Sequence, residues 1–243
     1  MKLRIKFRKF GPVKFIGHLD VMRFFQKALR RAEVDVAYSG GFSPHQIMSF
    51  ASPLGVGLES NGEYFDVEIL SPISSQEFMD KVNAVSVFGL PVTDVRLLPD
   101  KAGNAMASVA AADYTIRFRE GRAFEPGWQQ KFEAFMEQDQ ILITKATKRG
   151  TAEIDLKPAI YKHCLFSDGT GDSIYLLVNA SSEGNIKPTL VMDAFAAYLG
   201  ETLQDNALLI TREETYGSML TDGQEKLVPL AEFGRWMEVR YEI

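Results

Sequence analysis

The stretch KLRIKFR, residues 2–8, alternates strictly between cationic and apolar residues. A period of two residues is typical of a β-strand that has one buried face and one face outside the core. Leu3, Ile5 and Phe7 are therefore expected to pack in the core. The side chains on the opposite face are all positively charged: Lys2, Arg4, Lys6 and Arg8.

Positive charge is concentrated near the N-terminus. The first fifty residues contain ten Lys or Arg and three Asp or Glu, a net charge of +7, whereas the whole chain carries −5. By difference, the other 193 residues carry −12. A local cluster of cations on an acidic protein indicates a binding site for an anion, and nucleic-acid backbones are the commonest large anions.

Hydrophobic periodicity and turn-forming residues predict an α+β protein of two domains. The first domain, residues 1–104, is expected to contain strands over 2–7, 35–38, 48–54, 63–70 and 93–98, with a turn at Asn61-Gly62 and helices over 18–33 and from 74 or 75. The second, residues 105–216, is expected to contain strands over 114–119, 141–146, 152–166 (broken at Pro158), 173–180 and 207–213, with helices over 126–138 and 188–199. A tail, residues 217–243, ends in a predicted strand over 236–243.

Both domains follow the order β-α-β-β-α-β, which predicts tandem ferredoxin-like domains with antiparallel sheets. Because both helices of such a unit lie on one face of the sheet, the other face is expected to stay open. The cationic row on residues 2–8 would then lie on this open face, where its spacing suits a nucleic-acid backbone. In the second domain, four aromatic residues at helical spacing are predicted to be core: Trp128, Phe132, Phe135 and Phe195.

A second group of candidate residues follows the first strand. The helix over 18–33 carries a basic face, and the loop SGGFSPH over 39–45 follows it. Gly40 and Gly41 allow backbone N–H groups to surround an anion, and an exposed Phe42 would offer a stacking surface for a base. The basic face of the helix consists of Arg23, Lys27, Arg30 and Arg31.

Histidines allow a catalytic alternative. His18 and His45, with Asp20 nearby in sequence, are the candidate catalytic residues, because a pair of imidazoles beside a phosphate can exchange protons near neutral pH. No further motif of a nucleotide-binding loop, a zinc peptidase or a serine hydrolase is present.

Cysteine content limits the expected cofactors. The chain contains one cysteine, Cys164, whereas a disulfide framework, a multi-cysteine zinc site and an iron–sulfur cluster each need several thiolates. We therefore expect no metal and no cofactor. The chain shows neither a secretory signal nor the roughly 20 apolar residues of a membrane span, so we expect a cytoplasmic protein that does not enter the membrane.

A series of short motifs runs through residues 1–70: Gly11-Pro12, Phe15, His18-Leu19-Asp20, Met22-Arg23, Ala28-Leu29-Arg30-Arg31-Ala32, Tyr38-Ser39, Gly41-Phe42, Pro44-His45, Ser49-Phe50-Ala51, Pro53-Leu54-Gly55-Val56 and Glu63-Tyr64. This pattern resembles the radical SAM-linked protein family, a bacterial family of unknown function. Its members are fused to a radical SAM protein or occur as a separate neighbouring chain. At the next position, where the family pattern has a second His-Pro pair or a basic residue, this chain has Gln46, which speaks against a charge-dependent role there.

The resemblance implies a partner rather than a reaction. A radical SAM enzyme needs three cysteines for its cluster, and one cysteine cannot supply them. We therefore predict a non-catalytic companion of a separate radical SAM RNA-modifying enzyme. It would bind RNA through Lys2, Arg4, Lys6, Arg8, Arg23, Arg30, Arg31, Gly40, Gly41, Phe42 and His45.

Two other functions remain open on the sequence. The first is a metal-independent RNA nuclease or transferase that uses His18 and His45. The second is a protein-interaction or small-molecule module whose basic face meets an acidic partner. The sequence also allows the cationic row to face the acidic second domain, in which case the charge asymmetry is internal.

Overall fold

The computed structural model describes residues 1–147, 150–169 and 171–238. The chain forms two compact units, one made of Met1–Ala110 with Arg212–Ile243 and the other of Ala111–Thr211. The boundary between residues 211 and 212 falls inside the long strand β10 (Leu208–Thr221). The first unit is therefore built from both ends of the chain.

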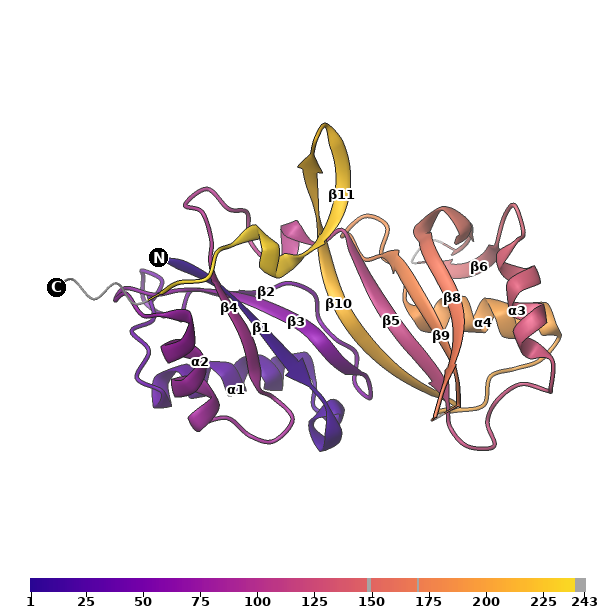
Figure 1. Cartoon of the computed structure of the whole chain (residues 1–243), viewed down its shortest axis with the longest axis horizontal. Coiled ribbons are helices and arrows are strands. Elements are labelled where there is room, and N and C mark those ends of the chain that lie inside the picture. The colour runs from indigo at the N-terminus through magenta and orange to yellow at the C-terminus, as the bar shows by residue number, and fades with distance from the viewer. Residues whose placement is uncertain (148–149, 170, 239–243) are drawn as a thin grey trace. The chain divides into compact units, whose positions relative to one another are not determined.

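The N-terminal part of the first unit has the predicted α+β element order. Its elements are β1 (Lys2–Lys9), η1 (Gly11–Phe15), α1 (His18–Arg31), β2 (Met48–Phe50), β3 (Glu59–Glu68), α2 (Ser75–Ala84) and β4 (Val92–Leu97). Antiparallel pairing gives the strand order β4-β1-β3-β2. Figure 1 shows α1 and α2 on the same face of this sheet.

The core of the first unit lies between this sheet and its helices. Leu3, Ile5 and Phe7 are at most 1% exposed, which confirms the prediction from their alternation. The rings of four phenylalanines from α1 and three strands pack together with centroids 4.7–6.4 Å apart: Phe7, Phe25, Phe50 and Phe65. The helix thus contributes the central aromatic residue of the core, Phe25.

Two local predictions in this unit were wrong. Residues 35–38 form no strand and contribute only the isolated bridges Val36–Ile69 and Tyr38–Gln46. The predicted turn at Asn61-Gly62 instead lies within β3. A Cβ at Gly62 would lie 2.6 Å from the Glu214 Cα, so this glycine allows the backbone of β10 to approach β3 closely.

The C-terminal part of the first unit covers the sheet face that was predicted to be open. After β10 come β11 (Gln224–Pro229) and η4 (Leu230–Phe233), and Asp222 and Gly223, both at positive φ, form the two-residue turn between β10 and β11. The Leu230 carbonyl accepts a hydrogen bond from Arg4 of β1. Figure 1 shows the segment after β11 running along the side of the sheet away from α1 and α2. The prediction of an open face was therefore wrong.

The predicted terminal strand over 236–243 is not seen in the described residues. Residues 236–238 are irregular, and residues 239–243 lie outside the described part of the chain. The connection between β4 and the second unit contains the short helix η2 (Met106–Ser108).

The second unit contains β5 (Ala111–Phe118), α3 (Trp128–Met136), β6 (Leu142–Thr147), β7 (Gly150–Asp155), η3 (Lys157–Ala159), β8 (Ile160–Asp168), β9 (Gly171–Asn179) and α4 (Pro188–Leu199). Strands β5, β9 and β8 pair in that order, whereas β6 and β7 form a separate two-stranded sheet. The predicted strand over 152–166 is two strands, because η3 interrupts it at Pro158. The four aromatic residues predicted as core are buried, as expected: Trp128, Phe132, Phe135 and Phe195.

None of the helices in these described ranges has the length and apolar character that a bilayer crossing requires.

Replacing Phe25 by alanine is expected to destabilise the first unit strongly. The side chain is fully buried and contacts four other aromatic rings, so Phe25→Ala should cost about 3–5 kcal/mol of unfolding free energy. Urea denaturation followed by circular dichroism measures this difference. Phe42→Ala is the matched control, because Phe42 is fully exposed and its loss should change stability by less than about 0.5 kcal/mol. Equal effects of the two substitutions would contradict the central position of Phe25 in the core.

Candidate nucleic-acid interface

Arg4 of the cationic row lies inside the first unit. Its side chain is 1% exposed, and its Nε and Nη2 donate to the two carboxylate oxygens of Asp66 at 2.8 and 3.1 Å. Asp66 is 2% exposed and lies opposite Arg4 on the neighbouring strand β3. A guanidinium that is buried and paired in this way cannot contact a phosphate backbone, so the prediction of an exposed Arg4 was wrong.

Other members of the row are also paired within the first unit. The Lys2 Nζ lies 3.7 Å from the Asp66 carboxylate, and the Lys6 Nζ lies 2.5 Å from the carboxylate of Glu214. Arg8 is exposed, but it donates to the Asn61 side chain. The acidic residues that balance the row come from β3 and β10. The open, unneutralised row expected from the sequence therefore does not exist.

The basic face of α1, by contrast, is exposed. Arg23, Lys27, Arg30 and Arg31 all lie at the surface, and the last three have no ion pair in the described parts of the chain. Arg23 lies 3.5 Å from Asp20, and both side chains are at least 60% exposed. An ion pair this exposed contributes little, so Arg23 remains accessible to another anion.

The loop over 39–45 is closed at its base and exposed at its tip. The Ser39 N–H donates to the His45 carbonyl at 2.8 Å, and the Ser39 hydroxyl lies 2.9 Å from the His45 Nδ1. Phe42 at the tip is fully exposed. Gly41 has a φ of +96°, which favours glycine, whereas Gly40 does not use the positive-φ region.

Gln46 connects this loop to α1. Its Nε2 donates to the Gln26 carbonyl at 3.2 Å and lies 3.5 Å from the hydroxyl of Tyr38, which is itself half exposed. Arg23 and Arg30 lie three residues before and four residues after Gln26, so they are on the same side of the helix. We call the exposed residues of this region the α1–loop surface: Arg23, Lys27, Arg30, Arg31, Tyr38, Phe42 and His45.

The candidate catalytic residues do not form one site. His18 begins α1, whereas the His45 loop is anchored at Gln26, eight residues or about 12 Å further along the helix. Asp20 pairs with Arg23 at the surface. A nuclease that uses both imidazoles on one phosphate finds no support in this arrangement.

His18 instead borders a buried polar cluster that the sequence analysis did not identify. Lys9 and Glu63 line the same cavity of about 10 Å³ as His18, and the Glu63 carboxylate accepts a hydrogen bond from Arg212 at 2.8 Å. Lys9, Glu63 and Arg212 are each at most 5% exposed. The alternation on β1 places Lys9 on the same face as Phe7, and this was the signal for its burial. Desolvation lowers the pKa of both Lys9 and His18.

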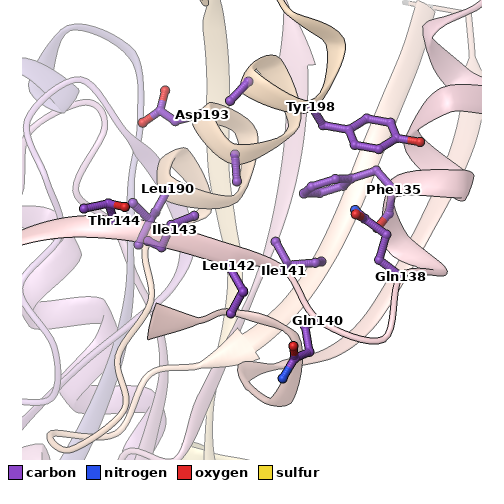
Figure 2. Close-up of a pocket in the computed structure, with 12 residues that line it drawn as sticks. Phe135, Gln138, Gln140, Ile141, Leu142, Ile143, Thr144, Leu190, Asp193 and Tyr198 are labelled. Carbon is purple, nitrogen blue, oxygen red and sulfur yellow. The ribbon is translucent and has the colours of Figure 1, made fainter. Parts of the chain in front are cut away.

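A groove in the second unit offers different chemistry. It has a volume of about 460 Å³ and lies between α4 and the segment that leads into β6 (Figure 2). The rings of Phe135 and Tyr198 pack 5.5 Å apart at one end, and Asp193 lies at the other. Burial raises the pKa of the Asp193 carboxyl. Among the described residues that line the groove none is cationic, so it does not suit a polyanion.

No group of three or more His, Cys, Asp or Glu side chains with metal-binding geometry occurs in residues 1–147, 150–169 and 171–238.

Removing the carboxylate that pairs with Arg4 should destabilise the protein. Asp66→Asn leaves a buried guanidinium without its counter-charge, and we expect a loss of about 3–5 kcal/mol in urea denaturation. Asp20→Asn is the control, because it breaks an exposed pair with Arg23 and should cost less than about 1 kcal/mol. A loss for Asp66→Asn no larger than the control would show that the buried pair does not hold the sheet face together.

His18 should make stability fall on acidification. Its lowered pKa means that the unfolded chain binds a proton at a higher pH than the folded chain does, so stability decreases as pH falls through the ordinary histidine value of about 6.5. His18→Gln should therefore reduce the difference in Tm between about pH 7.5 and about pH 5.5. Identical pH profiles for wild type and His18→Gln would refute this role.

The chain matches one protein family and resembles solved structures. Residues 2–188 match a family described as an uncharacterized protein conserved in bacteria (DUF2344). No curated protein matches the chain. Among solved structures, one from a crystal structure of a Cbf5–Nop10–Gar1 complex is similar to this chain, with a TM-score of 0.48 and 11% sequence identity over 88% of this chain and 48% of that chain. This chain thus spans about half the length of that protein. Because the family match covers most of its residues, the chain belongs to the DUF2344 family.

Proposed function

We propose that this protein binds single-stranded RNA through the α1–loop surface. The observation that carries the proposal is the combination of four exposed cations on one helix face with a fully exposed aromatic ring on the adjacent loop. Cations at a surface attract the phosphate backbone, and an exposed ring stacks on an unpaired base. Asp20 is the one acidic side chain within the basic face of α1 in the described structure.

The proposal modifies the site expected from the sequence. Lys2, Arg4 and Lys6 are left out, because carboxylates of the first unit neutralise them. Arg8 is left out because it lies on β1 and donates to the Asn61 side chain. Arg23, Arg30, Arg31, Gly40, Gly41, Phe42 and His45 remain, and the exposed Lys27 and Tyr38 join them. The glycines contribute a loop backbone with nothing within 4 Å of either Cβ position, which leaves space for a nucleotide.

We further propose that the protein is a non-catalytic companion of a radical SAM RNA-modifying enzyme in the cytoplasm. The resemblance of residues 1–70 to radical SAM-linked proteins supports this partner, and the single Cys164 supports a cluster held outside this chain. The proposal also keeps the two ferredoxin-like domains expected from the sequence. The strand order β4-β1-β3-β2 of the first unit supports the first of them.

A protein-docking role is the second candidate, and a specific observation favours it. Phe15, Leu19 and Val56 are each about 60% exposed and gather near the start of α1, where the Gly57 N–H donates to the Lys14 carbonyl. Exposed apolar side chains that lie together are typical of protein contacts. Pull-down from a lysate with and without nuclease separates the two roles, because a partner protein retained after nuclease treatment binds the protein itself.

The RNA-binding proposal predicts a strong salt dependence. With up to four phosphate contacts, the logarithm of the binding constant for a single-stranded RNA should fall with the logarithm of salt concentration with a slope of about −2 to −3. The double variant Arg23→Glu/Arg30→Glu should weaken binding by at least about tenfold and reduce the slope. Fluorescence anisotropy with a labelled oligonucleotide measures both quantities.

Matched controls test whether position matters. Lys81→Glu/Lys226→Glu changes the net charge equally at exposed sites elsewhere in the first unit and should leave binding nearly unchanged. Phe42→Ala should weaken binding about tenfold through lost stacking, whereas Phe88→Ala, at a ring 75% exposed, should not. If both charge-reversed variants lose affinity equally, the attraction is non-specific and the α1–loop surface is not the site.

A further inference from the structure

A cavity in the first unit lies on the side of the sheet that the C-terminal segment covers. Its volume is about 430 Å³, within the range of small-molecule sites. Its walls come from β1, from the connection after β4, from β10 and from η4. The side chains that matter for recognition are Arg4, Lys101, Ser108, Ser218 and Phe233. None of these residues belongs to the α1–loop surface.

Arg4 has a hydrogen-bond donor to spare in this cavity. A guanidinium carries five N–H groups. Two bond the Asp66 carboxylate, one on Nη2 reaches the Ser108 hydroxyl at 3.4 Å, and one on Nη1 reaches the Leu230 carbonyl at 3.3 Å. Among the described residues, the second N–H of Nη1 has no acceptor. A side chain that is 1% exposed and lines a cavity can satisfy this donor with an acceptor on a ligand.

Charge inside the cavity is already balanced. The Asp66 carboxylate neutralises Arg4, so the interior does not require an anion. Most of the remaining lining is apolar, with Pro99, Ala102, Val109 and the ring of Phe233 among the walls. An uncharged, planar ring that carries a carbonyl acceptor fits such an interior better than a phosphate does. A phosphate inside the cavity would have no cation to neutralise it, because Arg4 is already paired with Asp66.

The ring of Phe233 is held in place by close packing. The centre of this ring lies 5.9 Å from the Arg4 guanidinium carbon. A Cβ at Gly217 would lie 2.6 Å from two atoms of the Phe233 ring and 2.8 Å from the Ser108 carbonyl oxygen. The Phe233 ring and the Ser108 backbone therefore both pack directly against Gly217. The Phe233 ring therefore holds a fixed position in the wall of the cavity.

The connection after β4 brings a free cation to the same cavity. Lys101 is exposed and forms no ion pair among the described residues, whereas the neighbouring Ala102 and Gly103 carbonyls accept hydrogen bonds from the Lys2 Nζ. Lys2 thus anchors the connection that carries Lys101. An exposed ammonium beside an apolar, charge-balanced interior suits a ligand with a phosphate at one end and a ring at the other.

We propose that this cavity binds a single nucleotide, with the base inside against Phe233 and Arg4 and the phosphate outside at Lys101. We take guanine as the base, because its carbonyl oxygen can accept the one N–H of Arg4 that has no acceptor among the described residues. The proposal rests on the proposed function in taking its ligand from RNA, and it adds a pocket for one unpaired nucleotide of that RNA.

Isothermal titration calorimetry of the full chain with GMP, guanosine and inorganic phosphate tests the proposal. We expect GMP to bind more tightly than guanosine, and phosphate alone not to bind. Ala107→Trp, at an exposed position that lines the cavity, should weaken GMP binding by at least about tenfold. Met106→Trp is the matched control, because Met106 is exposed beside it but does not line the cavity, and this variant should bind GMP as the wild type does. Lys101→Ala should remove the preference for GMP over guanosine.

Absence of GMP binding up to about 10 mM, or equal binding by Ala107→Trp and wild type, would overturn the proposal. Phosphate binding as tight as GMP binding would overturn the role of the base. The Phe42→Ala variant separates this inference from the proposed function, because it should lose affinity for the RNA oligonucleotide and retain affinity for GMP. If GMP binds and no variant of the α1–loop surface changes RNA binding, the nucleotide site in the cavity is supported and the proposed RNA interface is refuted.

Discussion

The buried ion pair between Arg4 and Asp66 is the interaction on which the first unit depends. It joins β1 to β3 on the sheet face away from the helices, and the same guanidinium binds the Leu230 carbonyl and the Ser108 hydroxyl. A buried charge is tolerable only when its partners are fixed and its hydrogen bonds are made. The C-terminal segment and the connection after β4 are therefore held against the sheet by a polar anchor as well as by apolar packing.

The inward face of this sheet could be predicted from sequence, and the outward face could not. Alternation over residues 2–8 identifies Leu3, Ile5 and Phe7 as core, because the period of a strand is a local property. The burial of Arg4 depends on a segment that includes Leu230, which lies 226 positions away in sequence. No local pattern reveals that contact. For the same reason Gly62 was interpreted as a turn, although it lies in a strand where Glu214 approaches.

Some features of the candidate interface could likewise be predicted from the sequence, and others could not. The basic face of α1 and the exposed tip at Phe42 follow from helical periodicity and from a loop rich in glycine, both of which are local signals. Neutralisation of Lys2 and Lys6 depends on Asp66 and Glu214, whose strand pairing no short-range pattern specifies. Lys9 is the one cation of this strand whose burial a local pattern does predict. Continuing the alternation by two residues from Phe7 places Lys9 on the buried face.

The discontinuity of the first unit has a consequence for how the protein is made. On the ribosome, residues 1–110 emerge first, and all of the second unit follows before residue 212 appears. Until then the Arg4 side of the nascent sheet has no C-terminal cover, and the second unit, which is continuous in sequence, can fold first. Residues that follow the second unit in the sequence therefore complete the domain that residues 1–110 begin.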